Sequence, residues 1–472
     1  MTVAGTFEQR VLLGRDLVIA RPSLWFDCFI WAILPTSLNV LRVLDPNGPK
    51  HVALVALLAL LVKNLVFAPA TSLHGLKSIY STSVFKVVPA RTILVIYLLV
   101  QILFIADIRA LGSYYTFSNA IANNVLLVFG PVALLTSLMI AETPERRTTI
   151  FRAFLLGYPL YMLINVGLFA AGMRSAVIEI EDDSNQVLGG LGLHIGRALL
   201  PLGYGKNGMG TLAAASLLIC LFSWSRGWGW MARLAYVVLG LFSLVAIVLI
   251  DSRAALAFSF LAIGIALRAR RSWRFVRLGK WIILAFPLVP ILAVWMFDVI
   301  NKAGGISFLI RGGDSGARLG VGTGRGAIWG AVLDRLSQPE WIDLVGYGNF
   351  GHIESRVSAA YAWVFNSLGG TINGVHNAFL QYVMDCGYLG GAIWLSMLFV
   401  LFSNLQRIGR ERRVAGVELA MLAVSAFVYL QSQTEPLGTI YNPESLMLVI
   451  GLCIFSGAMS LSRAPAGGAV AR

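Results

Sequence analysis

The chain has 472 residues, of which 57% are hydrophobic and only 13% are charged. A soluble domain carries about 25% charged residues, because a polar surface must cover its core. The composition therefore excludes a soluble globular protein and indicates a polytopic membrane protein. The net charge of +14 also suggests that the protein could bind nucleic acid. The positions of the charged residues along the chain test this interpretation.

Apolar runs of membrane-spanning length occur along the whole chain. Residues 1–22 lack an apolar core with a cleavage site, so we expect no removable signal peptide. Beyond them, runs of about 17–25 mostly apolar residues predict about twelve membrane-spanning helices. The runs are 23–42, 51–70, 92–108, 119–141, 150–172, 209–225, 233–250, 254–268, 281–299, 387–405, 415–432 and 445–462. We therefore expect an all-α polytopic membrane protein, with residues 1–472 as a single integral membrane domain.

The basic residues predict the orientation of these helices. Twelve spans place both termini on one side, and with that side cytoplasmic the short cytoplasmic loops hold most of the Lys and Arg, the densest cluster being Arg268–Lys280. This is the distribution that the positive-inside rule predicts. The charge is thus explained by topology, and no nucleic-acid partner is expected.

Two loops on the opposite, outer side are long. They cover residues 173–208 and 300–386, and loops of this length are usually functional or disordered. The larger one holds a glycine-rich stretch, Gly312–Gly326, followed by an amphipathic helical pattern in Ala327–Leu333. We expect this loop to carry short helices within the membrane domain.

Three polar features converge on the outer side, and the first is the three-residue turn Asp251-Ser252-Arg253 between two apolar runs. So short a turn predicts a tight helical hairpin whose arginine points into the outer mouth of the bundle, oriented by Asp251. The alternative is an arginine that only extends its head group to the membrane surface.

The second feature is a set of three arginines, Arg311, Arg318 and Arg325, spaced seven residues apart among glycines. Glycine lets backbone N–H groups turn toward an anion, and guanidinium groups match phosphate oxygens, so the pattern predicts a diphosphate cradle. It is no Walker A loop, because no Lys-Ser/Thr follows. A basic loop attracted to lipid headgroups is the alternative.

The third feature is His376-Asn377 at the start of a helical pattern that enters the span 387–405. A histidine at a helix start is often structural, but histidine is also the side chain best suited to take a proton at neutral pH. The four cysteines, Cys28, Cys220, Cys386 and Cys453, lie in or beside apolar runs without a CxxC pair. We expect no metal site and no cofactor.

A family resemblance links the three features. His376-Asn377, nine residues, Gly387, two residues and Gly390 match the signature H-[NSQ]-x9-G-x-x-[GTY] of the bacterial O-antigen ligase family. Ser252-Arg253 resembles its S-R motif, although Ala254 stands where glycine is usual. Gly324-Arg325 with Trp329 resembles its G-R-x-x-x-W segment. The resemblance covers residues 235–405.

The family comprises O-antigen ligases, O-antigen and exopolysaccharide polymerases and some protein O-oligosaccharyltransferases. The resemblance implies metal-independent transfer of a glycan from an undecaprenyl-diphosphate carrier, on the periplasmic side of the bacterial inner membrane. It implies that Arg253 and Arg325 bind the diphosphate and that His376 is catalytic. Arg311, Arg318, Asn377 and Asp251 are the further candidates for substrate binding.

The acceptor distinguishes the activities within the family. A ligase uses the lipid A-core oligosaccharide, whereas a polymerase uses another lipid-linked repeat. The intact histidine signature favours a ligase, but polymerases of the family can carry it too.

Proteins of other classes remain as alternatives. A lipid-glycan transporter would use ionisable groups within spans, for which Lys63 and Glu418 are the candidates. A metal-dependent membrane glycosyltransferase would need acidic outer-loop residues, for which Asp45 and the cluster Glu179–Asp183 are available. A membrane scaffold would explain neither the arginine-glycine loop nor the histidine motif.

Overall fold

The structure is a computed structural model of the chain. It describes residues 24–44, 50–66, 84–111, 117–141, 143–175, 185–189, 192, 196–203, 205–224, 229–271, 274–302, 324–367, 374–411, 416–439 and 442–461. Two of the candidate residues, Arg311 and Arg318, lie outside these ranges, as do Asp45 and the cluster Glu179–Asp183.

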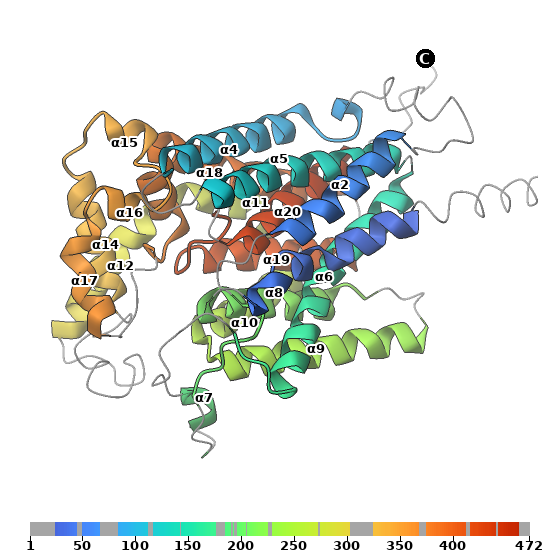
Figure 1. Ribbon diagram of the computed structural model, residues 1–472, viewed down its shortest axis with the longest axis horizontal. Coiled ribbons are helices and arrows are strands. Elements are labelled where there is room, and N and C mark those ends of the chain that lie inside the picture. Colours follow the sequence, from blue (N-terminus) through green and yellow to red (C-terminus); the bar gives the residue numbers. More distant parts are fainter. Residues whose placement is uncertain are drawn as a thin grey trace, which may run out of the picture.

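The described residues form helices and contain no β-strand (Figure 1). The expected all-α class is therefore confirmed. After an N-terminal helix at Leu24–Ser37, the helices are α2 (His51–Val66), α4 (Ala90–Arg109), α5 (Phe117–Ile140), α6 (Pro144–Ala170), α7 (Gln186–Gly189), α8 (Lys206–Phe222), α9 (Trp230–Ile250), α10 (Arg253–Arg271), α11 (Arg274–Ile282), α12 (Leu288–Lys302), α14 (Arg325–Leu336), α15 (Ile342–Val345), α16 (Gly351–Glu354), α17 (Ser358–Ser367), α18 (Ala378–Glu411), α19 (Val417–Gln431) and α20 (Pro443–Leu461). Short 3-10 turns lie at Val40–Val43, Val84–Lys86 and Ile283–Ala285.

Six of the described helices are long and apolar enough to cross a membrane: α4, α5, α6, α9, α18 and α20. A pair bent by 63°, Gly279–Ala285 with Leu288–Ile300, would make a seventh span. Each of the twelve predicted runs falls on a helical segment, but several of these, such as α8 and α19, have fewer than 18 residues. The chain is thus a membrane protein, and the count of twelve spans stays a prediction.

The core of the helix bundle is built around α19 and α20. Every residue from Pro443 to Ser460 in α20 is buried, as expected for a helix that is apolar all round. α20 packs against α4, α5, α6, α18 and α19, while α19 packs against α8 and α10. Figure 1 shows both helices in the middle of the bundle.

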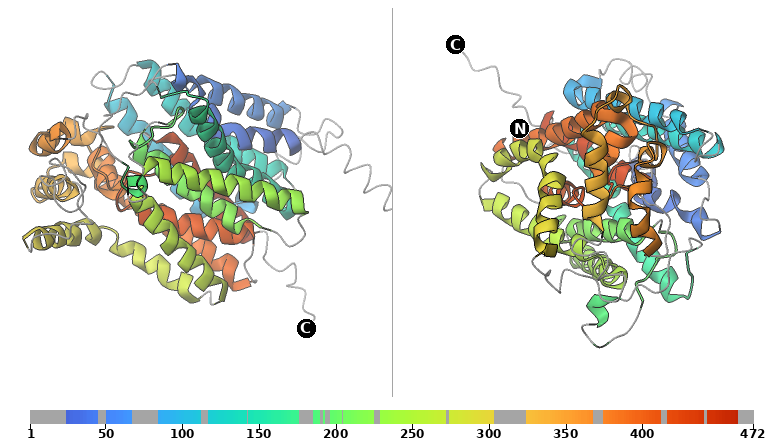
Figure 2. Two further views of the ribbon diagram at one scale, coloured as in Figure 1. Left: turned by 90° about the horizontal axis from the view of Figure 1, so that it is seen from below. Right: turned by 90° about the vertical axis from the view of Figure 1, so that its left-hand side faces the viewer.

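Four short helices, α14 to α17, form a small unit at one end of the molecule, here called the α14–α17 cap (Figure 2). The cap has an apolar cluster of its own, which includes Trp329, Val332 and Tyr361 and extends to Met384 of α18. The amphipathic pattern at Ala327–Leu333 lies within α14, as the sequence predicts. The cap brings residues of the larger expected loop to the start of α18.

Candidate functional site

The turn before α18 holds His376 in a fixed position. The residue has a φ of +53°, which is uncommon for a side chain other than glycine. Asn377 is fully buried; its side-chain oxygen accepts the Leu380 N–H at 3.0 Å, and its amide donates to the Gln433 carbonyl at 3.0 Å. The side chain of Asn377 therefore caps α18 and ties the histidine turn to the loop after α19.

A carboxylate in that loop contacts the histidine. Glu435 Oε2 lies 3.2 Å from His376 Nδ1, and the two side chains are 7% and 17% exposed. Glu435 follows α19 directly, in the segment that returns the chain to α20.

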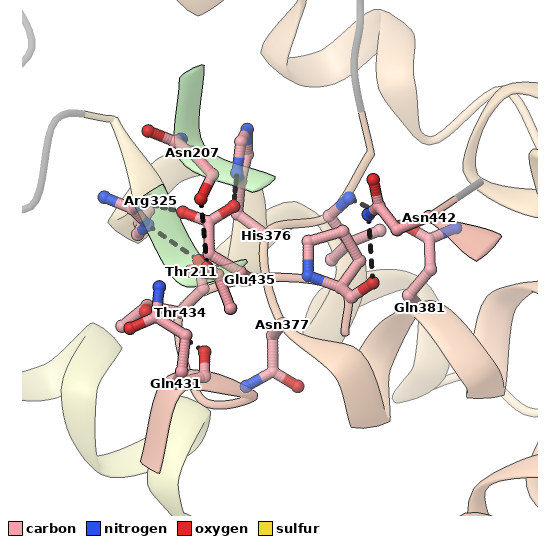
Figure 3. Close-up of polar contacts among 12 residues, drawn as sticks. Asn207, Thr211, Arg325, His376, Asn377, Gln381, Gln431, Thr434, Glu435 and Asn442 are labelled. Carbon is pink, nitrogen blue, oxygen red and sulfur yellow. Dashed lines mark hydrogen bonds and ion pairs between the residues drawn. The ribbon is translucent and has the colours of Figure 1, made fainter. Parts of the chain in front are cut away.

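The second oxygen of the same carboxylate binds an arginine. Arg325 begins α14 after Gly324, and its Nη2 atom lies 2.6 Å from Glu435 Oε1. The Arg325 Nε–H also donates to the Thr434 carbonyl at 3.3 Å. One buried carboxylate thus joins Arg325 and His376, which are 51 positions apart in the sequence (Figure 3).

The charge of Glu435 is stabilised by these two partners. Burial by itself raises the pKa of the carboxyl, but His376 and Arg325 more than offset this, and the net pKa lies below the ordinary value of 4.5. Glu435 is therefore ionised at neutral pH.

The N-terminal turn of α8 borders this group. Gly208 faces the side chain of Asn442, and Asn442 donates to the carbonyl of Pro436, the residue after Glu435. Figure 3 shows Asn207 and Thr211 of the same turn next to the labelled group, and Thr211 donates to the Asn207 carbonyl at 2.9 Å. The site thus has polar side chains on more than one side.

The turn between α9 and α10 lies against α8. α9 ends at Ile250 and α10 begins at Arg253, so the expected short turn is present. Ser252 packs so closely on Gly210 that a Cβ atom on this glycine would lie 2.3 Å from the Ser252 Cβ. Because Gly210 is three residues from Asn207, the turn lies about one helical turn along α8 from the site.

Arg253 is half-buried and forms no hydrogen bond or ion pair with another described residue. The expected orienting contact from Asp251 is therefore not found. Asp251 itself is 2% exposed, with the left-handed backbone (φ 52°) that ends α9. The structure brings Arg325 and His376 together through Glu435, and it leaves Arg253 outside that ion-pair group.

Comparison with known proteins bears on the same region. Residues 238–395 match the family model described as O-antigen ligase. This region is therefore similar to the O-antigen ligase family. The match confirms the resemblance drawn from the three motifs, and its bounds agree closely with the expected 235–405. No curated protein matches the chain.

The geometry explains the glycines of the O-antigen ligase signature. Gly387 has a φ of +71°, which makes a kink within α18, and a Cβ atom there would lie 2.3 Å from the backbone of Leu344 in α15. A Cβ atom on Gly390 would lie 2.2 Å from the Cβ atom of Cys386. In this chain neither position leaves room for a Cβ atom, and Gly387 needs glycine for its backbone conformation as well.

Glu435 lies outside the O-antigen ligase match and outside all three sequence motifs, which therefore do not predict it as a site residue. A signal for it exists. The run Gln431-Ser-Gln-Thr-Glu435 is polar between two apolar runs, and the expected topology places it on the same side as His376. Glu435 is 59 residues from His376 in the sequence, so the sequence alone does not predict that the two side chains are in contact.

The structure also locates the residues that suggested a transporter. Lys63 Nζ pairs with Asp27 at 2.7 Å, which joins α2 to the helix Leu24–Ser37. Glu418 lies in the first turn of α19, at the opposite end of that helix from Glu435. Within the described ranges, no three His, Cys, Asp or Glu side chains lie close enough to hold a metal ion.

Proposed function

We propose that this protein transfers a glycan from an undecaprenyl-diphosphate carrier to an acceptor sugar hydroxyl, on the periplasmic side of the bacterial inner membrane. The similarity of residues 238–395 to the O-antigen ligase family points to ligase- or polymerase-type activity. The proposed roles of individual residues are supported by the buried carboxylate of Glu435, which contacts both Arg325 and His376.

In the proposed reaction, His376 is the general base. A bond forms between the acceptor oxygen and the anomeric carbon, the bond from that carbon to the diphosphate oxygen breaks, and the acceptor proton passes to the histidine. Contact of Nδ1 with a carboxylate favours the tautomer with a lone pair on Nε2, so Nε2 takes the proton. The Glu435 carboxylate then stabilises the imidazolium. A single displacement of this kind inverts the anomeric configuration.

The leaving group is a lipid diphosphate that gains negative charge as the bond breaks. Arginine can supply the compensating charge at a fixed position. Arg325 uses Nη2 and Nε within the protein, which leaves further N–H donors of its five for phosphate oxygens. Arg253, with no bonded partner among the described residues, is the second diphosphate ligand.

The remaining candidates take supporting roles. Asn377 is a positioning residue, because both atoms of its side-chain amide bond within the protein. Arg311 and Arg318, outside the described residues, and Asp251 remain proposed substrate contacts. For the acceptor we propose the lipid A-core oligosaccharide, as in a ligase.

The test uses membranes that contain His376→Ala, Arg325→Ala or, as a control, the exposed His51→Ala at matched protein levels. Transfer from a lipid-diphosphate-linked glycan is expected to fall about 10²–10⁴-fold in His376→Ala and to stay unchanged in the control. Full activity of Arg325→Ala would remove its assignment to the diphosphate.

The glycans of cells that lack the protein identify the acceptor. Long chains that remain on the carrier lipid are expected for a ligase. Single repeats on the carrier would instead identify a polymerase and overturn the lipid A-core assignment.

A further inference from the structure

A cationic cavity of about 510 Å³ lies between α4, α11 and α18. Four cations line it, Arg91, Lys280, Arg407 and Arg410, and no carboxylate is among the described residues that line it. We propose that this cavity binds the phosphate headgroup of an anionic membrane phospholipid. The proposal concerns a second site and does not depend on the proposed transfer reaction.

The cavity is far from the His376 site. Arg91 lies at the start of α4, whereas the far end of this helix reaches the α14–α17 cap, where Arg109 donates to the Val345 carbonyl at 3.4 Å. Along α18, Arg407 follows the kink at Gly387 by 20 residues, which is about 30 Å at the helical rise. This separation is the thickness of the hydrocarbon core, so the cavity opens at headgroup level on the opposite side of the membrane.

Two of the cations are held in place by the protein. Arg91 Nη2 donates to Asn404 Oδ1 at 2.7 Å, and Asn404 in turn donates to Thr92 and Ser456. Lys280 Nζ lies 5.1 Å from the centre of the Trp281 ring and 5.8 Å from that of Phe399. An anion that enters the cavity therefore meets cations whose positions are already fixed, which reduces the entropy cost of binding.

An amide in the wall distinguishes the cavity from a purely basic surface. Gln406 lines the cavity, is only 6% exposed, and makes no hydrogen bond with another described residue. The amide atoms of Gln406 are not among the fully buried, unpartnered polar atoms of the described residues, so they are open to a molecule in the cavity. The positive-inside rule explains basic residues at this end, but it does not explain a cavity with an accessible amide in its wall.

Apolar side chains next to the cations favour a lipid over a soluble phosphate. Phe399 forms part of the cavity wall, and the neighbouring Trp281 and Leu284 are 55% and 57% exposed. An aromatic residue beside cations at the end of a span is typical of the membrane interface. Guanidinium groups bind phosphate oxygens while the acyl chains lie along these apolar side chains.

The experiment measures lipid binding by the full-length protein in detergent, by native mass spectrometry. The probes are dioleoyl-phosphatidylglycerol, dioleoyl-phosphatidylcholine and inorganic phosphate. The test variants are Arg407→Gln with Arg410→Gln, and Gln406→Leu. The matched control is Arg268→Gln with Arg270→Gln, which removes two exposed cations of α10 that do not line the cavity.

We expect phosphatidylglycerol to bind more tightly than phosphatidylcholine, and its affinity to fall about tenfold in the Arg407/Arg410 variant. Gln406→Leu should weaken binding as well, and the α10 control should retain it. An equal loss in the control would show diffuse charge attraction and overturn the site. Competition by inorganic phosphate as effective as that by the lipid would show a soluble anion site and overturn the lipid assignment.

Discussion

Oε2 of Glu435 lies 3.2 Å from Nδ1 of His376, although 59 residues separate them in the sequence. If His376 is the base, as we propose, this contact positions it, and the other oxygen of Glu435 positions the arginine proposed to bind the diphosphate. A carboxylate in contact with one ring nitrogen of a histidine orients the ring and selects its tautomer.

The first prediction concerns this carboxylate. Glu435→Gln keeps the size of the side chain but removes its charge, and we expect transfer to fall about 10–100-fold. Glu435→Asp should recover part of the loss, because the charge returns at a shorter reach. Asp334→Asn, an exposed carboxylate of α14, is the control. Wild-type activity of Glu435→Gln, with a loss in Glu435→Asp, would show that Glu435 acts through its shape alone.

The second prediction concerns Arg253, which has no bonded partner to lose among the described residues. Arg253→Ala should therefore leave the thermal unfolding temperature nearly unchanged while the KM for the lipid-linked donor rises about tenfold or more. Arg253→Lys should restore only part of the affinity, since an ammonium group lacks the planar fork of donors. An unchanged KM in Arg253→Ala would exclude it from donor binding.

The third prediction concerns the kink in α18. Gly387→Ala places a Cβ atom 2.3 Å from the Leu344 backbone at a φ of +71°. Strain of this kind costs roughly 1–3 kcal/mol before the clash is counted, so we expect a lower unfolding temperature in detergent. The matched control is Gly264→Ala in α10, where a Cβ atom meets nothing within 4 Å. Alanine there should be neutral or stabilising. Equal unfolding temperatures of the two variants would show that neither the backbone conformation at residue 387 nor its contact with Leu344 requires glycine.

Local patterns in the sequence predicted local structure well. Each apolar run falls on a helical segment, the pattern at Ala327–Leu333 lies in α14, and the turn at Asp251–Arg253 lies between two helices. Contacts between distant segments were harder to predict. Hydrophobic periodicity does not indicate which loops are in contact. The contacts of Arg325 and His376 with Glu435 were therefore found only in the three-dimensional structure.

Side-chain roles were also hard to infer from position in a motif. The sequence predicts that Asn377 contacts substrate, and that stays a prediction; the structure shows it buried, with both amide atoms bonded to the backbone. Such a residue also holds the turn, because buried backbone groups must be satisfied.

The last prediction concerns pH and His352, the histidine of the α14–α17 cap. His352 in α16 is fully buried, and Gln381 Nε2 lies 3.2 Å from its Nδ1 atom and also donates to Asp385. Nε2 of His352 has no partner among the described residues. Burial, with a smaller contribution from the nearby His376, lowers the pKa of His352 to about 3.

A depressed histidine pKa makes the folded state less stable in acid. Below about pH 6.5 the unfolded chain takes up a proton at this position, whereas the folded protein does not until about pH 3. From pH 7 to pH 5 this one group should lower the free energy of unfolding by about 2 kcal/mol. His352→Gln cannot titrate, so its unfolding temperature should fall less between these pH values than that of the wild type. The exposed His51→Gln should behave like the wild type, and an equal acid shift in all three proteins would show that His352 is not the group responsible.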